Sequence, residues 1–143
     1  MEKSAFAKTM ARTVSALHTN VYRWFGGAGP FNRHTLILTT RGRKTGRDVS
    51  TPLLYVSAGG RYYIVASFGG SDQPPAWYLN LVKSPEVTIE VRRSRTRCRA
   101  RSLTPEDATL IWPKLLAIWP AYATYQKRTP RIIPVVELMP TEG

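Results

Sequence analysis

The sequence predicts a strand-rich α+β fold, a small closed or half-open barrel flanked by helices. Three observations predict it. Short strand-like runs separated by glycine-containing turns fill residues 34–103. A helical pattern interrupted by prolines follows, and an amphipathic stripe precedes the strands. With no internal repeat, we expect residues 1–30 to form an N-terminal amphipathic helix and linker, and residues 31–143 to form the barrel domain.

The N-terminal stripe covers residues 1–25, where apolar side chains recur at steps of three and four. Packing of this helix on the core is the commoner explanation for such a stripe. A basic amphipathic helix lying on a membrane surface is the alternative. The glycine-rich segment 26–30 ends the helix. The stripe consists of Phe6, Met10, Val14, Leu17, Val21 and Trp24.

The first strands are predicted from runs of β-branched and aromatic residues. Residues 34–40 form one strand, and residues 49–58 return along it after a basic turn. Gly59 and Gly60 are a two-residue hairpin signal, and residues 61–67 form the next strand.

A second hairpin follows a loop and a short helix over residues 76–82. Its strands are residues 86–91 and 95–103, and alternation puts a row of arginines on one face. A solvated face is the commoner explanation, and a nucleic-acid or lipid-headgroup surface is the functional alternative. Cys98 points away from the arginines, so we expect a small buried core residue. The arginines are Arg93, Arg95, Arg97, Arg99 and Arg101.

The C-terminal part begins with a helix start at Thr104, which is followed by a proline and two acids. Pro113 and Pro120 predict two or three short helices with bends. Residues 131–140 return to strand, and Pro134 predicts an edge strand or a bulge there.

The composition limits the kinds of partner that this protein can bind and the compartment in which it works. A net charge of +12, from 21 Lys+Arg against 9 Asp+Glu, favours nucleic acid, an acidic membrane or an anionic cofactor. A single cysteine excludes an intramolecular disulfide and fits a reducing cytoplasm, and the two histidines are not spaced as metal ligands. We find no membrane-spanning apolar run and no signal peptide core, so we expect a cytoplasmic protein.

The turn between the first two strands carries four cations and two glycines within residues 39–48. It lacks the spacing of a phosphate-binding P-loop, and a strand rather than a helix follows it. Its backbone N–H groups can converge on an anion, reinforced by Arg43, Lys44 and the Thr45 hydroxyl. Basic turns without ligands are common, so this pattern alone leaves both interpretations open.

Catalytic side chains are scarce. No Ser-His-Asp spacing or nucleophile elbow is present, so an enzyme of this composition would leave the chemistry to a cofactor. Trp119, Tyr122 and Tyr125 step by three and line one helix face if Pro120 opens a turn. This spacing is equally compatible with aromatic residues of the hydrophobic core and with residues of a binding site.

Taken together, several segments resemble the deazaflavin-dependent nitroreductase family. These are split β-barrel (FMN-binding-like) oxidoreductases of actinobacteria that use the deazaflavin coenzyme F420. The resemblance covers residues 34–138, and it implies a split β-barrel with flanking helices. The segments, in order, are LTTRGRKTGRDVSTPLLYV, YIVASFGG, PAWYLNL, SPEVTIEV, IWPAYATYQKRT and RIIPVVEL.

The resemblance also implies a site. The basic turn would hold the coenzyme's phosphate and polyglutamate tail, the following strand would lie along it, and two further segments would enclose the ring system. An aromatic cluster would cover the open face and shape the substrate pocket. The implied cofactor-binding residues are Arg43, Lys44, Thr45, Val49, Ser50, Thr51, Pro52, Leu53, Leu54, Val65, Ala66, Ser67, Phe68, Ala76, Trp77, Tyr78, Leu79, Asn80 and Tyr122. The implied catalytic residues are Ser67, Trp119, Tyr122 and Tyr125.

The implied reaction is hydride transfer from reduced F420 to a quinone, or to a related acceptor such as an enone or a nitroaromatic. Two-electron reduction avoids semiquinones, which implies a protective role. Trp119 and Leu54 stand where the nitroimidazole-activating member has tyrosines, and Phe68 occupies a position that is often polar, so these departures count against nitro-compound reduction.

Four further expectations concern partners and alternative functions. No nucleic acid is expected as a partner, and some members of the family associate with the membrane, so contact with its inner face is compatible with the resemblance. The alternative function is a non-enzymatic basic module that binds nucleic acid or an acidic membrane. A barrel binding FMN or haem is disfavoured, because neither His18 nor His34 lies in the pocket segments.

Overall fold

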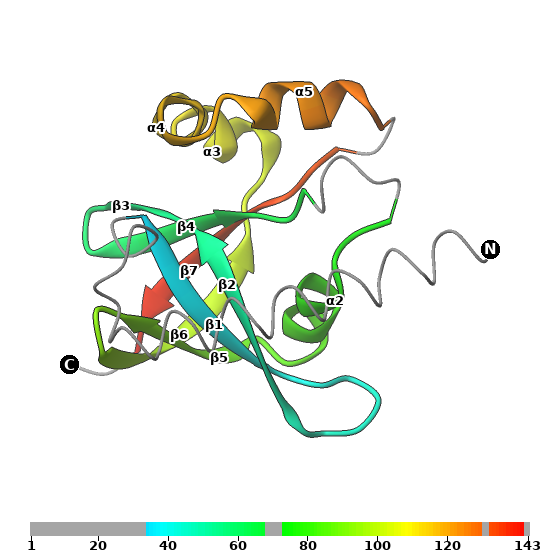
Figure 1. Cartoon of the computed structure of the whole chain (residues 1–143), viewed down its shortest axis with the longest axis vertical. Helices are drawn as coiled ribbons and strands as arrows, with labels where there is room; N and C mark the ends of the chain where they lie inside the picture. Colours follow the sequence, from blue (N-terminus) through cyan, green and yellow to red (C-terminus); the bar gives the residue numbers. More distant parts are fainter. Residues whose placement is uncertain (1–33, 68–72, 130–131, 142–143) are drawn as a thin grey trace.

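The computed structural model describes residues 34–67, 73–129 and 132–141, and its centre is one antiparallel sheet (Figure 1). The predicted N-terminal helix and Phe68 lie outside the described residues. The strands are β1 Thr35–Arg41, β2 Asp48–Leu54, β3 Val56–Ala58, β4 Arg61–Val65, β5 Glu86–Val91, β6 Ser94–Ser102 and β7 Val135–Pro140. The helices are α2 Ala76–Lys83, α3 Pro105–Thr109, α4 Trp112–Ile118 and α5 Ala121–Lys127.

The sheet is curled into a half-barrel. Its strand order is β2-β1-β5-β6-β7-β4-β3, so β2 and β3 lie at opposite edges. Only Tyr55 separates these two strands along the chain, and its N–H donates to the His34 carbonyl at 2.8 Å. Since one residue joins the two edges, the sheet must bend until they meet. The predicted split-barrel fold with flanking helices is confirmed.

Two hydrophobic cores lie on the two faces of this sheet, because successive side chains of a strand point to opposite faces. On β4 and β7, Ile64 and Val136 enter the barrel interior, whereas Tyr63, Val65 and Val135 enter the outer core. Helix α2 closes the interior core, and α3, α4 and α5 cover the outer one at one end of the molecule (Figure 1). Each fully buried large apolar side chain stabilises the fold by about 1.5–3 kcal/mol.

Most predicted elements are confirmed. The first strand, both strands of the second hairpin and the helix after the loop lie within a residue or two of their expected bounds. Gly59 and Gly60 form the predicted turn with φ of 60° and 78°, values that favour glycine. Thr104 caps α3, since its side-chain oxygen accepts from the Asp107 N–H at 3.2 Å. The segment with two prolines forms three short helices.

The long returning strand and the last strand are corrected. Residues 49–58 are not continuous, because the chain leaves one sheet edge at Tyr55 and joins the other. The strand predicted to reach residue 67 ends at Val65. Pro134 is neither in an edge strand nor in a bulge. It precedes β7, an interior strand, and its carbonyl accepts from the Ala66 N–H at 3.0 Å, a role that needs no proline N–H.

The arginine row is confirmed with one exception. Along β6 the arginines are exposed while Cys98 and Ala100 are buried, as alternation requires. Arg93, however, lies in the β5–β6 turn with φ of 70° and does not belong to the row. No helix within the described ranges is long and apolar enough to cross a membrane.

Candidate active site

The basic turn between β1 and β2 is closed by its own backbone. The Gly42 N–H donates to the Arg47 carbonyl at 2.7 Å, and the Gly46 N–H donates to the Gly42 carbonyl at 2.8 Å. Gly46 has φ of 74°, and the Arg47 N–H donates to the Thr45 hydroxyl oxygen at 3.2 Å. Among the described residues, no partner takes the N–H groups of Lys44 and Thr45, so those two donors remain for an anion.

A side chain from α2 braces this turn. Asn80 is 3% exposed, and its Oδ1 accepts from the Arg43 backbone N–H and guanidinium, each at 3.1 Å. Its Nδ2 donates to the Thr40 hydroxyl at 3.2 Å. The Lys83 ammonium donates to the Arg43 carbonyl at 3.0 Å. Helix α2 therefore fixes the conformation of the turn and holds the Arg43 side chain against the C-terminal half of the helix.

This bracing contact was missed by sequence reasoning, which assigned Asn80 only to the ring pocket. The signal was present: Asn80 is the one amide in the helix sequence AWYLNLVK, and it shares a buried face with Trp77 and Leu81. A buried amide needs hydrogen-bond partners, so its place on an apolar face predicts a polar contact that the helix alone does not supply.

The charges of the turn suit a polyanion. Arg41, Lys44 and Arg47 are exposed, and Asp48 at the start of β2 is the one acid among residues 39–48. Ammonium and guanidinium groups beside two open backbone N–H groups form the donor set that phosphates and carboxylates bind. These residues fit the phosphate and carboxylates of a coenzyme with a polyglutamate tail.

Strand β2 extends from this turn as an edge strand, paired in the described sheet with β1 alone. Val49 is 42% exposed, and residues 50–54 are half-buried. The Ser50 and Thr39 hydroxyls lie 2.9 Å apart and fix one cross-strand pair. A strand with one open edge gives an extended ligand a place to lie.

The segments predicted to enclose the ring system are mostly core. Val65 packs in the outer core, and Ala66 and Trp77 pack in the barrel interior. Ser67 is 8% exposed and lies two residues after the end of β4. Ala76, Tyr78 and Leu79 on α2 are half-buried, and the Tyr78 hydroxyl lies 2.8 Å from that of Ser102.

The aromatic residues form one cluster. The Trp119 Nε1–H donates to the Tyr125 hydroxyl at 3.4 Å, and the Tyr122 and Tyr125 rings meet edge to face at 6.1 Å. Tyr122 also meets Trp112 edge to face at 6.3 Å, and the Arg128 guanidinium lies 5.7 Å from the Tyr125 ring. Since α5 begins at Ala121, Trp119 lies in the joint before it rather than on the shared helix face that the spacing predicted.

Within this cluster, burial keeps the Tyr122 hydroxyl protonated. Tyr122 is 7% exposed, and this desolvation, with the nearby Tyr125, raises its pKa to about 12. Its hydroxyl is therefore a proton donor in hydrogen bonds at neutral pH. Trp119 is 42% exposed, so the cluster has one buried and one open side. A mostly apolar cavity of about 350 Å³ adjoins it between α4 and α5, lined by Trp112, Leu116, Tyr122, Ala123, Gln126 and Lys127.

The turn and the cluster lie far apart, since α4 and α5 sit at one end of the sheet and the β1–β2 turn at the other (Figure 1). The curled antiparallel half-barrel with flanking helices places the chain in the class of split-barrel proteins. Within this class, the family model of F420H(2)-dependent quinone reductases matches residues 14–140. The chain belongs to this family.

Individual proteins similar to this chain support the same family assignment. An F420H(2)-dependent quinone reductase of Mycobacterium tuberculosis is 37% identical over 134 residues, covering 85% of this chain and 87% of the relative. The solved structure of an F420-H2 dependent reductase is 34% identical with a TM-score of 0.69, covering 74% of this chain and 94% of that one. The haem storage protein HutZ from Vibrio cholerae, 16% identical with a TM-score of 0.57, shares the fold alone and covers 87% of this chain and 90% of HutZ.

Family membership confirms three expectations: the chain is an oxidoreductase, its cofactor is coenzyme F420, and the family's activity is quinone reduction. The alternative of a non-enzymatic basic module gains no support from these relatives.

Proposed function

We propose that this protein transfers a hydride from reduced F420 to a quinone, with the β1–β2 turn holding the coenzyme's anionic end and the aromatic cluster receiving the acceptor. When bound, the reduced deazaflavin supplies the hydride and resists one-electron chemistry. The observation that carries the proposal is the turn braced by Asn80, which offers cations and two open N–H groups on a chain of this family.

Binding of the coenzyme divides among three elements. Lys44 and Thr45 bind the phosphate through their N–H groups and side chains. The Arg43 guanidinium, held by Asn80, adds positive charge to the same turn. The half-buried side chains of β2 lie along the coenzyme. Ser67 and the half-buried residues of α2 would hold the ring system.

The acceptor is oriented by the cluster. Trp119 and Tyr125 offer flat surfaces to a flat quinone. The Ser67 or Tyr122 hydroxyl donates a hydrogen bond to the quinone oxygen on which negative charge develops. Hydride addition and one proton, from Tyr125 or solvent, convert the quinone to its hydroquinone. Tyr122 serves as a hydrogen-bond donor rather than a proton source, because its pKa of about 12 keeps it protonated.

Quinones are the preferred acceptors in this proposal, and activated enones are a second class. Nitroaromatics are disfavoured, because Trp119 and Leu54 replace tyrosines of the nitroimidazole-activating relative. A two-electron reduction bypasses the semiquinone, so the cellular role is protection against one-electron quinone cycling, in the cytoplasm or at the inner face of the membrane.

Anaerobic mixing with reduced F420 and menadione tests the reaction. We expect oxidation of the coenzyme, followed by its visible absorption, and hydroquinone without an electron paramagnetic resonance signal from semiquinone. Lys44→Ala weakens coenzyme binding about tenfold, the worth of one charge-assisted contact, whereas Lys114→Ala on α4 leaves it unchanged. Absence of oxidation with every quinone and enone tried contradicts the reaction. Unchanged affinity in Lys44→Ala contradicts the phosphate assignment alone.

A further inference from the structure

The cavity between α4 and α5, called here the α4–α5 cavity, has no part in the proposed hydride transfer. Its volume of about 350 Å³ lies within the range of small-molecule sites. Most of its lining is aliphatic or aromatic, which is also typical of such sites. The lining residues are Trp112, Leu116, Tyr122, Ala123, Gln126 and Lys127.

Helical spacing builds this cavity from one face of each helix. Trp112 and Leu116 on α4 are four residues apart, and so are Tyr122 and Gln126 on α5. Tyr122 is buried in the outer core, whereas Trp112 and Leu116 are half-buried and pack against that core. Ala123 is exposed at the same place. The cavity therefore presents apolar side chains that the core covers only in part.

The two polar lining residues leave the cavity largely apolar. The Gln126 Oε1 accepts from the Ile133 N–H at 2.9 Å, so this amide oxygen holds the chain that follows α5. Lys127 is exposed at the end of α5, and the stem of a lysine can cover apolar surface while its ammonium group stays in water. The cavity thus offers hydrocarbon contact with a single cation at its edge.

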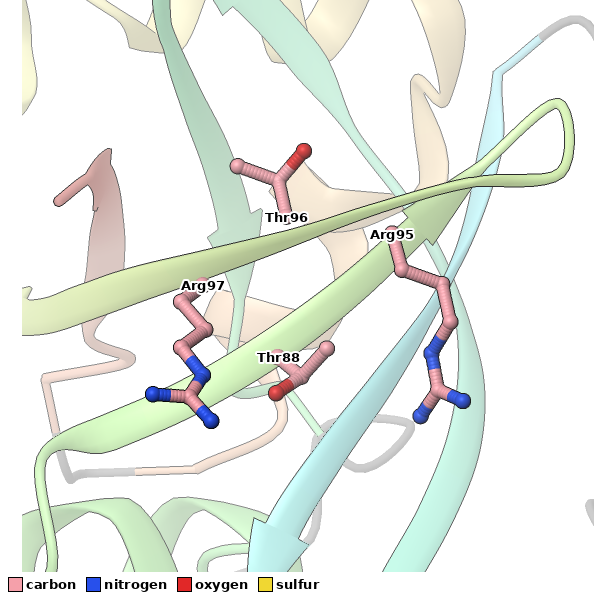
Figure 2. A pocket seen from close by; sticks show the side chains of 4 residues that line it. All are labelled: Thr88, Arg95, Thr96 and Arg97. Carbon is pink, nitrogen blue, oxygen red and sulfur yellow. The ribbon is translucent and has the colours of Figure 1, made fainter. Parts of the chain in front are cut away.

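A cavity on the β5–β6 hairpin shows the contrast. Its volume is about 270 Å³, and every side chain that lines it carries a hydroxyl or a guanidinium (Figure 2). Such groups lose hydration without compensation when a hydrocarbon covers them. Of these two cavities, the α4–α5 cavity is therefore the one that suits an apolar ligand. The hairpin cavity is lined by Thr88, Arg95, Thr96 and Arg97.

Tyr122 connects the α4–α5 cavity to the aromatic cluster. Its ring meets the Tyr125 ring edge to face at 6.1 Å and the Trp112 ring edge to face at 6.3 Å. Tyr125 belongs to the cluster that receives the acceptor, and Trp112 lines the cavity. One buried ring is thus shared by both, so a substituent on a bound acceptor has an apolar surface next to it.

We propose that the α4–α5 cavity is a specificity subsite for a hydrocarbon chain carried by the quinone, with Trp112, Leu116 and Ala123 as its contact residues. The inference rests on the proposed function, because the cluster has to hold the quinone ring for the chain to reach the cavity. A hydrocarbon chain needs no hydrogen-bond partner, and each methylene that leaves water strengthens binding about fourfold. The substrate class is therefore quinones with an aliphatic chain rather than bare quinones.

Binding without turnover tests the subsite first. The probe is menadione with a hexyl chain on its free quinone carbon, titrated without coenzyme and followed by amide chemical shifts. We expect saturable shifts at Leu116, Ala123 and Lys127, and an affinity at least about tenfold above that of menadione. Ala123→Trp fills the cavity from an exposed position and removes this gain.

The matched control for the binding test is Thr124→Trp. It adds the same ring one residue along α5, at an exposed position that does not line the cavity, and it retains the gain in affinity. Shifts that stay linear without saturation overturn the subsite. A gain of equal size in the two tryptophan variants overturns it as well.

Steady-state kinetics with reduced F420 test the same subsite during turnover. The ratio of kcat/KM for hexyl-substituted menadione to that for menadione should be at least about tenfold in wild type and Thr124→Trp. The ratio should fall to near one in Ala123→Trp. A chain of the same length that contains ether oxygens should give a ratio near one in all three proteins, because it gains little by leaving water.

The kinetic outcomes separate this inference from the proposed function. Equal efficiency with both quinones in wild type overturns the subsite and leaves quinone reduction intact. Absence of turnover with both quinones contradicts the proposed function, and the binding titration then still decides whether the cavity takes the chain.

Discussion

At the scale of single residues, Asn80 links the fold to the site. Its amide contacts the first strand and the basic turn at once, with Oδ1 accepting twice from Arg43 and Nδ2 donating to Thr40. Because the side chain is buried, any substitution that removes these bonds leaves the partner groups without them. The orientation of Arg43 and the shape of the turn therefore depend on a residue that need not touch the coenzyme's phosphate.

Asn80→Ala tests this dependence. We expect coenzyme affinity to fall about tenfold, because the turn loses the contacts that hold it in one conformation. Titration calorimetry with oxidised F420 measures the change. Thr109→Ala removes a side-chain hydrogen bond on the exposed side of α3 and leaves the affinity at the wild-type value. Equal affinities for all three proteins would show that the turn does not need its brace.

Cys98 gives a residue-scale prediction on pH. Burial raises the pKa of its thiol from 9.0 to about 11, so the thiolate forms more readily in the unfolded chain. The stability contributed by the neutral buried thiol is complete below pH 9 and is lost as the pH rises toward 11, up to about 2–3 kcal/mol. Tyr122 adds a similar loss between pH 10 and about 12.

Urea unfolding of wild type and Cys98→Ala between pH 7 and pH 11 checks this sign. At pH 7 the variant is less stable, because it lacks the buried sulfur. We expect the difference in unfolding free energy to shrink above pH 9, since only the wild type has a thiol that ionises on unfolding. A difference that is constant with pH, or that grows, contradicts the assignment.

At the scale of elements, a carboxylate joins three strands beneath the helical layer. Glu137 on β7 lies directly opposite Tyr63 on β4 and Arg101 on β6. Its carboxylate accepts from the Tyr63 hydroxyl at 3.2 Å, and Arg61 and Arg101 approach it at 3.2 and 3.3 Å. Arg101 also reaches Asp107 on α3 at 3.8 Å. This network connects the sheet to α3, the helix that precedes the two helices carrying the aromatic cluster.

Glu137→Gln should lower the free energy of unfolding by about 2 kcal/mol, because a buried carboxylate with two cationic partners loses its charge. Chemical denaturation at neutral pH measures this. The matched control is Glu86→Gln, which removes the exposed cross-strand partner of Arg99 and costs less than about 1 kcal/mol. If the two variants lose equal stability, the buried ion pairs of Glu137 contribute no more to the free energy of unfolding than the exposed pair of Glu86.

At the scale of the whole molecule, local sequence signals predicted the elements well, and long-range contacts explain the rest. The Gly59-Gly60 turn, the Thr104 cap and the buried Cys98 follow from neighbours in the chain. The break at Tyr55 does not, because it reflects the meeting of two sheet edges that no local pattern encodes. Pro134 was misjudged for the same reason, since its place depends on the β4 end.

In the candidate site, too, local sequence signals predicted some features and long-range contacts determine the others. The basic residues of the turn were visible in the sequence, and so was the spacing of the aromatic residues. The bond between Asn80 and the turn was not predicted, because it joins positions 37 residues apart. Likewise, the position of Trp119 in a joint depends on how α4 ends, a boundary that spacing alone does not define.

The two-ended site is the central claim, and steady-state kinetics with two variants test it most directly. With reduced F420 and a quinone, Lys44→Ala should raise the KM for the coenzyme about tenfold and leave the KM for the quinone unchanged. Trp119→Ala at the other end should raise the KM for the quinone several-fold and leave that for the coenzyme unchanged. If either variant raises both constants alike, or if Trp119→Ala affects only the coenzyme, the division of the site between turn and cluster is wrong.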